Sequence, residues 1–219
     1  HEVKEHSRAV LDRQWEETLD ALGGPPALYQ IHSATLDSGV LDNAAVLERL
    51  AEIRDAGTAI GLTTSGPKQA ETLARAMEVA IDGRPLFDAV QATCNLFEPS
   101  VAAQLERASD SGMAVIIKEA VANGRLTARN DRPEDAEAMR VLDGVAGAHG
   151  VGRDAVAIAA LLARPWVDMV LSGAGTVVQL AANLEALDVE LSVDERRALD
   201  GLAEPAENYW QTRGGLAWN

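Results

Sequence analysis

The chain has little cysteine and no long apolar run. Cys94 is the single thiol among 219 residues, which excludes an internal disulfide framework and makes a reducing compartment the default expectation. No stretch is long and apolar enough to span a bilayer, and residues 1–6 are too polar for a signal peptide. We therefore expect a cytoplasmic protein.

Positive charge is also scarce. Lysine and arginine number 19 against 34 aspartates and glutamates, so the formal net charge is −15. Such a chain repels nucleic acid and anionic membranes, which makes both poor candidate partners. No ligand set with suitable spacing surrounds His1, His6 or Cys94, so we expect no metal site. A small molecule is the expected partner, and 47% apolar residues suffice for a substantial core.

Strand-like and helix-like stretches alternate along most of the chain. Strands are predicted at residues 27–32, 58–64, 87–95, 113–120 and 167–171. Helices are predicted at residues 7–22, 43–55, 67–81, 99–111, 134–149 and 154–163, then from 176 to about 187, with a last one opening at Ser192. The polar residues 125–133 are expected to form a surface loop.

This alternation predicts an α/β fold with a parallel sheet, because strands that are joined through helices run parallel. A doubly wound sheet and a (β/α) barrel both satisfy the pattern. The doubly wound dinucleotide fold normally has a glycine-rich turn after its first strand, and this chain has none there. A barrel is therefore favoured, although the predicted strands are fewer than the eight that a barrel needs.

The first predicted strand ends in His32, at the end where barrels of this type hold their chemistry. Because side chains alternate along a strand, Gln30 shares the face of His32 and Tyr29 lies on the opposite face. The pattern favours a catalytic role for His32. The alternative is a histidine that caps the strand by bonding to a loop carbonyl.

Five segments resemble the aldo-keto reductase superfamily in order and spacing. They are residues 28–32 (LYQIH), 60–64 (IGLTT), 90–96 (VQATCNL), 123–126 (NGRL) and 171–174 (LSGA), the last accompanied by Asn183. The resemblance implies a (β/α)₈ TIM barrel that binds a nicotinamide cofactor, with the predicted strands as the fourth to eighth. It covers nearly the whole chain, so we expect residues 1–219 to form a single domain with an aromatic tail at 204–219.

The resemblance also implies a catalytic tetrad of aspartate, tyrosine, lysine and histidine, in which only the histidine has a match, His32. In the family's chemistry, hydride passes from the nicotinamide to a carbonyl carbon while the tyrosine protonates the oxygen. Tyr29 is a poor substitute, because alternation turns it toward the helices. We expect this chain to be part of a longer NAD(P)H-dependent reductase of aldehydes or ketones. The alternative is a non-catalytic nicotinamide-binding or regulatory fragment.

Contacts to the nicotinamide follow from the resemblance position by position. Gln91 matches a glutamine that bonds the carboxamide, and Thr63 and Thr64 match a serine–asparagine pair with the same duty. A satisfied strand-end amide and ordinary β-branched strand residues are the alternatives. Lys118 stands where relatives carry a tyrosine stacked on the nicotinamide, and it either offers charge there or reaches solvent. Cys94 is interpreted as a small core filler.

The segment Ser172-Gly173-Ala174-Gly175-Thr176 opens a helix whose free amides and dipole suit an anion such as a cofactor phosphate. A merely flexible turn is the alternative. Gln179 and Gly173 stand where relatives that prefer NADPH carry basic residues, and Asn183 completes the expected contacts. NADP(H) is the expected cofactor, and NAD(H) stays open.

Three arginines of the polar loop, Arg125, Arg129 and Arg132, have two interpretations. They reach across a cofactor pyrophosphate, or they form solvated surface. Neither the loop nor its charge pattern decides between these interpretations.

The tail contains two of the four tryptophans. In the family this segment forms part of the substrate pocket, and Trp210 is the candidate to wall an apolar cleft for a carbonyl substrate. The alternative is a strap that anchors the terminus to the barrel, which is the favoured interpretation for Trp218.

Overall fold

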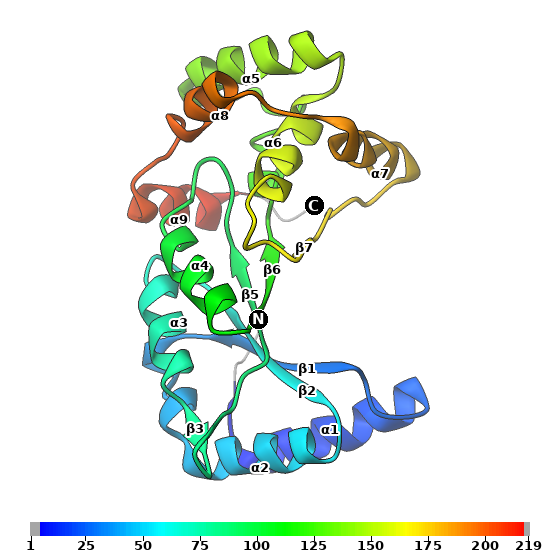
Figure 1. The fold of residues 1–219 in the computed structure, drawn as a ribbon, viewed down its shortest axis with the longest axis vertical. Coiled ribbons are helices and arrows are strands. Elements are labelled where there is room, and N and C mark those ends of the chain that lie inside the picture. The colour runs from blue at the N-terminus through cyan, green and yellow to red at the C-terminus, as the bar shows by residue number, and fades with distance from the viewer. Residues whose placement is uncertain (1–4, 217–219) are drawn as a thin grey trace. The chain divides into compact units, whose positions relative to one another are not determined.

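The computed structural model describes residues 5–216 as alternating helices and strands (Figure 1). The strands are β1 (Leu28–Ala34), β2 (Ala59–Thr64), β3 (Ala80–Ile81), β4 (Arg84–Pro85), β5 (Ala89–Thr93), β6 (Ala114–Lys118) and β7 (Met169–Val170). The α-helices are α1 (Arg8–Leu22), α2 (Ala44–Asp55), α3 (Gln69–Met77), α4 (Ala102–Asp110), α5 (Ala136–His149), α6 (Arg153–Leu162), α7 (Val177–Leu184), α8 (Val193–Asp200) and α9 (Ala206–Gly215). Residues 1–4 and 217–219, which include His1 and Trp218, lie outside the described part.

The main sheet has the strand order β1-β2-β5-β6-β7. The pairings β1–β2, β2–β5 and β6–β7 are parallel. Each of the five strands overlaps a predicted strand region, and β1 continues two residues beyond its predicted end at His32. The predicted α/β class with a parallel sheet is therefore confirmed. Within residues 5–216 the sheet is open, with β1 and β7 at its edges, and the closed barrel stays a prediction.

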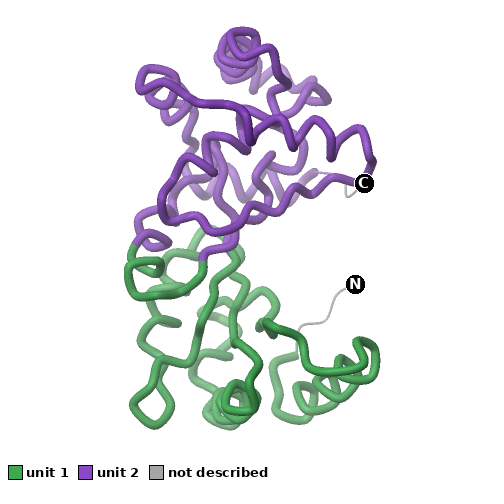
Figure 2. Tube along the Cα trace, turned by 45° about the vertical axis from the view of Figure 1, so that its right-hand side comes forward, with its two compact units in different colours: residues 1–91, 107–114 green, residues 92–106, 115–219 purple. Residues whose placement is uncertain are grey.

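The chain divides into two compact units (Figure 2). The first unit comprises residues 1–91 and 107–114, and the second comprises residues 92–106 and 115–219. Both β5 and β6 begin in the first unit and end in the second. The prediction that residues 1–219 form a single domain stays a prediction.

In the first unit, α1 and α2 pack side by side, and α2 lies against β2 (Figure 1). Val46, Leu50 and Ile53 recur at helical intervals along α2 and are all buried, which explains the packed face of this helix. Glycine is required at position 61 of β2. A Cβ there would lie 3.0 Å from the carbonyl oxygen of Ala89, so the neighbouring strand leaves no room for a side chain.

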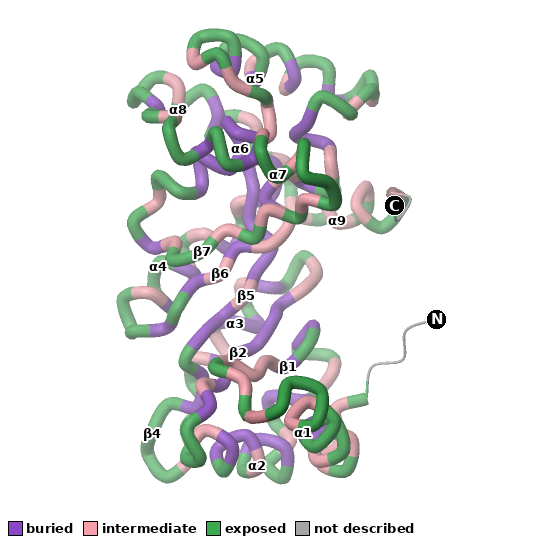
Figure 3. Tube along the Cα trace, turned by 90° about the vertical axis from the view of Figure 1, so that its right-hand side faces the viewer, coloured by how far each residue is buried: buried purple, intermediate pink, exposed green. Residues whose placement is uncertain are grey.

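In the second unit, α6 is the most buried helix, whereas α7 is largely exposed (Figure 3). Residues 155–161 of α6 are all buried, and this helix packs against α5 and α7. On α7, Val177 and Val178 are 84% and 79% exposed. Across residues 5–216, no single helix is long and apolar enough to cross a membrane. Residues 133–149 and 153–162 pass that test only as a pair that is bent by 85°.

Side-chain caps fix the starts of several helices. Ser7 and Asn43 each accept a hydrogen bond from the backbone N–H three residues on, before α1 and α2. Ser192 and Glu195 form a reciprocal capping box before α8. The predicted helix starts at Ser7 and Ser192 are confirmed.

Two helix predictions differ from the structure. The helix predicted at residues 67–81 ends at Met77, because Ala80–Ile81 pairs antiparallel with Arg84–Pro85. Asp82 and Gly83 join these strands with φ angles of 52° and 74°, and an Asp-Gly pair is a signal for such a turn. In the second case, the tail after residue 204 contains α9, which the sequence did not predict as a helix.

Candidate active and cofactor site

The carboxyl end of β1 carries an irregularity next to His32. Between Ile31 and Ala34, β1 has one residue more than the stretch of β2 with which it pairs. Ser33 accommodates the extra residue with a φ of 50°, and its N–H donates to Thr63 Oγ1 over 2.7 Å. Bulges of this type redirect side chains at strand ends. The hydrogen bond to Thr63 therefore sets the backbone that follows His32.

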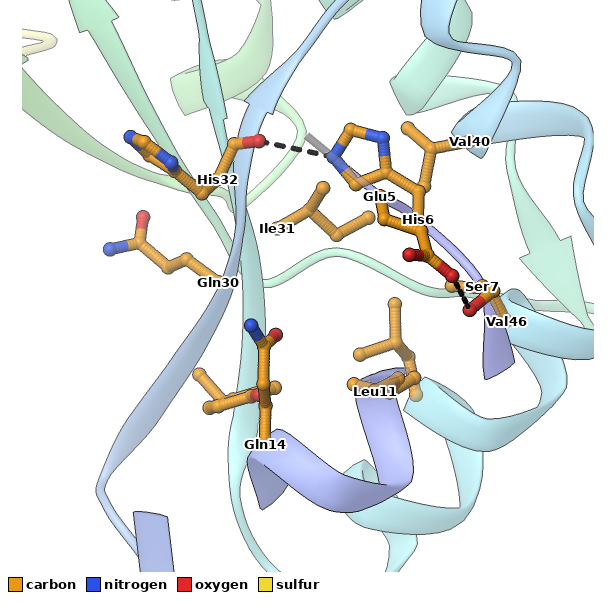
Figure 4. A pocket seen from close by; sticks show the side chains of 12 residues that line it. Glu5, His6, Ser7, Leu11, Gln14, Gln30, Ile31, His32, Val40 and Val46 are labelled. Atoms are coloured by element: carbon orange, nitrogen blue, oxygen red, sulfur yellow. Dashed lines mark hydrogen bonds between the residues drawn. The ribbon is translucent and has the colours of Figure 1, made fainter. Parts of the chain in front are cut away.

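Side chains around His32 leave β1 in alternating directions (Figure 4). His32 and Gln30 point to one side of the strand, and Ile31 points to the other, as the alternation predicts. Tyr29 packs edge-on against Trp15 of α1, with ring centroids 5.1 Å apart. The prediction that Tyr29 faces the helices is confirmed, so its phenol does not share the face of His32.

A cavity of about 220 Å³ lies between β1 and the start of α1 (Figure 4). Apolar side chains such as Leu11 and Val40 line it together with His6. The Nε2 atom of His6 lies 3.2 Å from the carbonyl oxygen of His32 and donates to it in the tautomer with a proton on Nε2. His6 thus bonds the backbone at the strand end that carries His32.

Thr63 and Thr64 end β2, whereas Gln91 is the central residue of the neighbouring strand β5 and not a strand-end residue as predicted. Thr63 and Gln91 are Cα partners in the β2–β5 pairing, so the structure brings two of the predicted nicotinamide contacts together. The hydroxyl of Thr64 is fully buried and lies 3.4 Å from Gln69 Oε1, to which it donates. This contact is a structural role for Thr64, whereas Gln91 is half-buried. Their cofactor roles stay predictions.

Cys94 follows β5 and is 2% exposed. Burial, together with the nearby Glu98 carboxylate, raises the pKa of its thiol to about 12. The thiol is therefore neutral at physiological pH, and a thiolate nucleophile is disfavoured. This environment agrees with the interpretation of Cys94 as a core filler.

In the second unit, a cavity of about 130 Å³ gathers five of the predicted cofactor residues. Its walls include Ser172, Gly173, Ala174, Gln179 and Asn183. It is also lined by Val121, Thr127, Ala128 and Arg129 of the loop after β6 and by Asp154 of α6. We call this space the 172–183 pocket. Residues far apart in sequence, which local patterns do not connect, converge on it.

The loop that opens α7 is fixed by its own side chains. Gln179 Oε1 accepts from the Gly175 N–H over 2.8 Å, and Thr176 Oγ1 accepts from the Gln179 N–H over 3.2 Å. Asn183 Nδ2 donates to the Ser172 carbonyl over 3.0 Å. These bonds give the segment a defined geometry, which disfavours the flexible-turn alternative. The N–H groups of Gly175 and Gln179 were expected to bind an anion, and these internal hydrogen bonds occupy them. An anion in the 172–183 pocket would therefore depend more on side-chain contacts than predicted.

The three loop arginines have different environments. Arg125 is 4% exposed and pairs with Asp135 over 2.6 Å and with Glu204 over 2.5 Å. Both interpretations of Arg125 are therefore wrong, because this guanidinium is neither solvated nor available to a cofactor. Arg132 lies 3.5 Å from the same Asp135 carboxylate.

Arg129 is exposed and lines the 172–183 pocket. Its guanidinium passes over Gly124, where a Cβ would lie 3.4 Å from Nη2. Among residues 5–216, no carboxylate pairs with it within 4 Å, so its charge is available to an anionic ligand. Of the three arginines, Arg129 is the one that lines this pocket, and its contact with a cofactor stays a prediction.

Lys118 ends β6 and is half-buried. Glu119 follows it with a left-handed φ of 56°, and Val121 two residues later lines the 172–183 pocket. The predicted contact of Lys118 with the nicotinamide stays a prediction.

Trp210 of α9 has ring contacts with Tyr209 and Arg213. Its ring meets Tyr209 edge-on at 5.7 Å, and the Arg213 guanidinium lies 5.5 Å from its centroid. The buried Nε1 has no hydrogen-bond partner within residues 5–216. The substrate contact predicted for Trp210 stays a prediction. The strap predicted for Trp218 lies outside the described residues.

A sequence model of the aldo/keto reductase family matches residues 1–204. A search of curated proteins gives no match. Among solved structures, the thermostable aldo-keto reductase Tm1743, in complex with the inhibitor epalrestat, is 24% identical with a TM-score of 0.68, and the match covers 89% of this chain and 66% of that chain. The aldo-keto reductase AKR11C1 from Bacillus halodurans is 20% identical, with TM-scores of 0.71 in its holo form and 0.72 in its apo form.

The match to AKR11C1 covers 94% of this chain in the holo form and 93% in the apo form, and 72% of the other chain in both. This chain thus spans about two thirds of the length of the solved relatives. At these identities the solved structures show the shared fold alone. The family model extends over nearly all of the sequence, and the chain therefore belongs to the aldo/keto reductase family.

Proposed function

We propose that this protein is an oxidoreductase that transfers hydride between NAD(P)H and an aldehyde or ketone. Family membership supports an oxidoreductase of the aldo-keto reductase type. The observation that carries the proposal is the 172–183 pocket, where five residues that were predicted as cofactor contacts from sequence line one cavity. Small ligand sites of this type combine a concave wall with a few placed polar groups.

NADP(H) is the proposed cofactor, because Arg129 supplies the positive charge that the segment 172–183 lacks. A guanidinium beside polar loop side chains suits a phosphate group, which it can bind through two parallel hydrogen bonds. The net charge of −15 makes such a local cation more important, since the rest of the chain repels anions.

NAD(H) is the second candidate, because Asp154 lines the same pocket. A carboxylate accepts hydrogen bonds from a ribose 2′-hydroxyl and repels a 2′-phosphate. Arg129 and Asp154 therefore favour different dinucleotides, and their relative contributions decide the preference.

His32, Thr63, Thr64 and Gln91 of the first unit are the proposed residues at the reacting end. Lys118 of the second unit is kept as a separate proposed contact to the nicotinamide. When bound, the nicotinamide supplies the hydride. Gln91 and Thr63 would hold the carboxamide, and the imidazole of His32 would orient the substrate carbonyl by a hydrogen bond. Trp210 is proposed to contact substrate.

The five strands are proposed to be the fourth to eighth of a (β/α)₈ barrel within a single domain. The share of the solved relatives that the chain covers supports this arrangement. The exposed apolar side chains on α7 and at Met169 support it as well, because apolar surface of this extent is normally covered. The tyrosine that protonates the carbonyl oxygen would then come from residues outside the 219, and the alternative is a non-catalytic nicotinamide-binding module. A cytoplasmic location is part of the proposal.

A cofactor titration tests the binding half of this proposal. We expect NADPH to bind the chain, with a rise in reduced-nicotinamide fluorescence, and we expect R129M to weaken NADPH by about tenfold or more, as for the loss of one charged hydrogen bond. R140M is the matched control, because Arg140 is 72% exposed and pairs only at the surface of α5. NADH should be affected less if Arg129 contacts the 2′-phosphate. Equal affinity of wild type and R129M for NADPH would contradict this assignment.

Turnover tests the catalytic half. A full-length parent that contains strand-end aspartate, tyrosine and lysine residues upstream should oxidise NAD(P)H with some member of a broad panel of aldehydes and ketones. Binding of NADPH without turnover on any of them would favour the non-catalytic alternative.

A further inference from the structure

The carboxyl-terminal segment and the loop after β6 are joined by two ion pairs in the second unit. Arg213 of α9 contacts Glu119 at the start of the loop, with Nη2 and Oε1 2.6 Å apart and Nε within 3.3 Å of both carboxylate oxygens. Glu204, which precedes α9, contacts Arg125 in the middle of the loop. The two pairs are thus spread over both ends of α9.

Tyr209 forms a third connection between them. It is 0% exposed, accepts a hydrogen bond from Asn95 Nδ2 over 3.0 Å and donates to Glu119 Oε2 over 3.3 Å. Asn95 also donates to the Glu119 carbonyl over 3.0 Å, so it touches the side chain of Tyr209 and the backbone of Glu119. Burial and the Glu119 carboxylate both raise the pKa of Tyr209, which keeps the phenol neutral and able to donate.

The loop that these contacts hold has an unusual backbone. Glu119, Ala122 and Asn123 have φ angles of 56°, 49° and 53°, which residues other than glycine rarely adopt. Such conformations persist where the surroundings fix them. The Asn123 side chain adds a hydrogen bond to Glu119 Oε2 over 3.2 Å, so the carboxylate of Glu119 is a centre for contacts from the loop as well as from α9.

The same loop forms one wall of the 172–183 pocket. It supplies Val121, Thr127, Ala128 and Arg129, and Lys118 directly precedes it. A shift at Glu119 would therefore move residues that are proposed to meet the cofactor. The side chains of Glu119 and Arg213 are 12% and 20% exposed, so their pairing is only partly screened by water.

We infer that α9 acts as a clamp, which means that its contacts hold the loop after β6 in the conformation that binds cofactor. Glu119 and Arg213 are the positioning residues of this clamp. Neither residue is assigned a contact with the reacting atoms. That the clamp shapes a cofactor pocket rests on the proposed function. That the clamp exists rests on the contacts of Glu119, Arg125 and Tyr209 alone. It gives the carboxyl-terminal segment a role in cofactor binding that is separate from the substrate contact proposed for Trp210.

Hydrogen exchange measured by mass spectrometry tests the clamp without any cofactor. We expect R213M to raise amide exchange in residues 119–130 by about tenfold or more, because the loop then opens locally. Y209F, which removes one hydroxyl and keeps the ring, should raise it less, and R213K should restore part of the protection. R140M is the control that removes an exposed arginine from α5 and should leave this loop unchanged.

NADPH affinity provides the second measurement. R213M and E119Q should weaken NADPH by about tenfold, and R213K should recover part of the loss, while R140M binds like wild type. Unchanged exchange in residues 119–130 of R213M would overturn the clamp. Faster exchange with unchanged NADPH affinity would overturn the positioning role. If the wild-type chain does not bind NADPH, the proposed function fails, and the exchange measurement still decides whether the clamp exists.

Discussion

At the scale of single residues, Gly61 shows how closely the strands of the first unit approach. An added Cβ would lie 3.0 Å from the Ala89 carbonyl oxygen and 3.1 Å from Gln30 Cγ. The carbonyl belongs to a paired strand, so it cannot move aside as a flexible side chain would. Gly61 is therefore required for packing, even though its backbone conformation is available to other residues.

G61A should lower the free energy of unfolding by about 1–3 kcal/mol, the usual cost of overpacking. G144A is the matched control, because Gly144 is exposed in the interior of α5 and has nothing within 4 Å of an added Cβ. That control should raise the free energy of unfolding by about 0.5–1 kcal/mol through helix propensity. Urea denaturation measures both, and a stabilising G61A would contradict the packing argument.

Sequence reasoning placed strand residues better than loop residues. The alternation along β1 correctly put Gln30 and His32 on one face and Tyr29 toward Trp15, because geometry of period two is local. Arg125 was misplaced because its partner Glu204 is 79 residues away, and no local pattern shows such a pairing.

At the scale of elements, the loop after β6 is organised around the buried guanidinium of Arg125. It pairs with Asp135 and Glu204 and lies 4.3 Å from the centroid of the Phe97 ring. Burial alone would lower the pKa of Arg125, but the hydrogen bonds that its guanidinium donates to the two carboxylates outweigh burial and raise the pKa. One permanently charged group thus connects the loop to the segment before α9 and to the N-cap of α5.

R125M should lower the free energy of unfolding by about 3–5 kcal/mol, because it leaves the buried Asp135 carboxylate without its main partner. R13M is the control: Arg13 and Glu17 are each 61% exposed on α1, and loss of such a pair costs about 0–1 kcal/mol. Thermal or urea unfolding distinguishes the two variants. Equal losses would show that the Arg125 pair contributes no more than a surface pair.

The same cluster predicts a pH dependence. Burial tends to raise the pKa of Asp135, but hydrogen bonds from Arg125 and Asn130 outweigh it and lower the pKa below 3.8. A carboxyl whose pKa is lowered in the folded state stabilises the fold above its unfolded pKa, and this stabilisation is lost as pH falls through the folded value.

D135N should therefore be less stable than wild type at pH 7, and the difference should narrow as pH falls below 3.8. Urea unfolding at a series of pH values between neutral and acidic measures this difference. A gap that stays constant on acidification would contradict the assignment to the ionised Asp135.

Some helix boundaries could be predicted from local sequence signals, and others could not. The capping residues Ser7 and Ser192 fixed their helices, because a side-chain cap is a local interaction. The helix α9 was missed because Tyr209 is its one buried position, so no apolar stripe with helical spacing marks it. Its stability comes from contacts with Glu119 and Asn95, which lie far away in sequence.

At the scale of the whole molecule, the chain is a five-stranded parallel α/β protein of the aldo/keto reductase family. The motifs that predicted the family were spread along nearly the whole sequence, which is why the fold class could be predicted without the structure. The 172–183 pocket could be predicted only in part. Its lining residues between 172 and 183 were predicted as cofactor contacts from sequence. Thr127 and Asp154 also line the pocket, and nothing in the sequence marked them as cofactor contacts.

The 172–183 pocket is proposed to bind the phosphate-bearing end of a dinucleotide. Calorimetric titration of the chain with adenosine 2′,5′-bisphosphate tests it most directly, because this ligand needs neither the nicotinamide residues nor a proton donor. We expect saturable binding that is tighter than for adenosine 5′-monophosphate and is weakened about tenfold or more by R129M. No binding of the bisphosphate, or binding that R129M leaves unchanged, would contradict a phosphate site in this pocket.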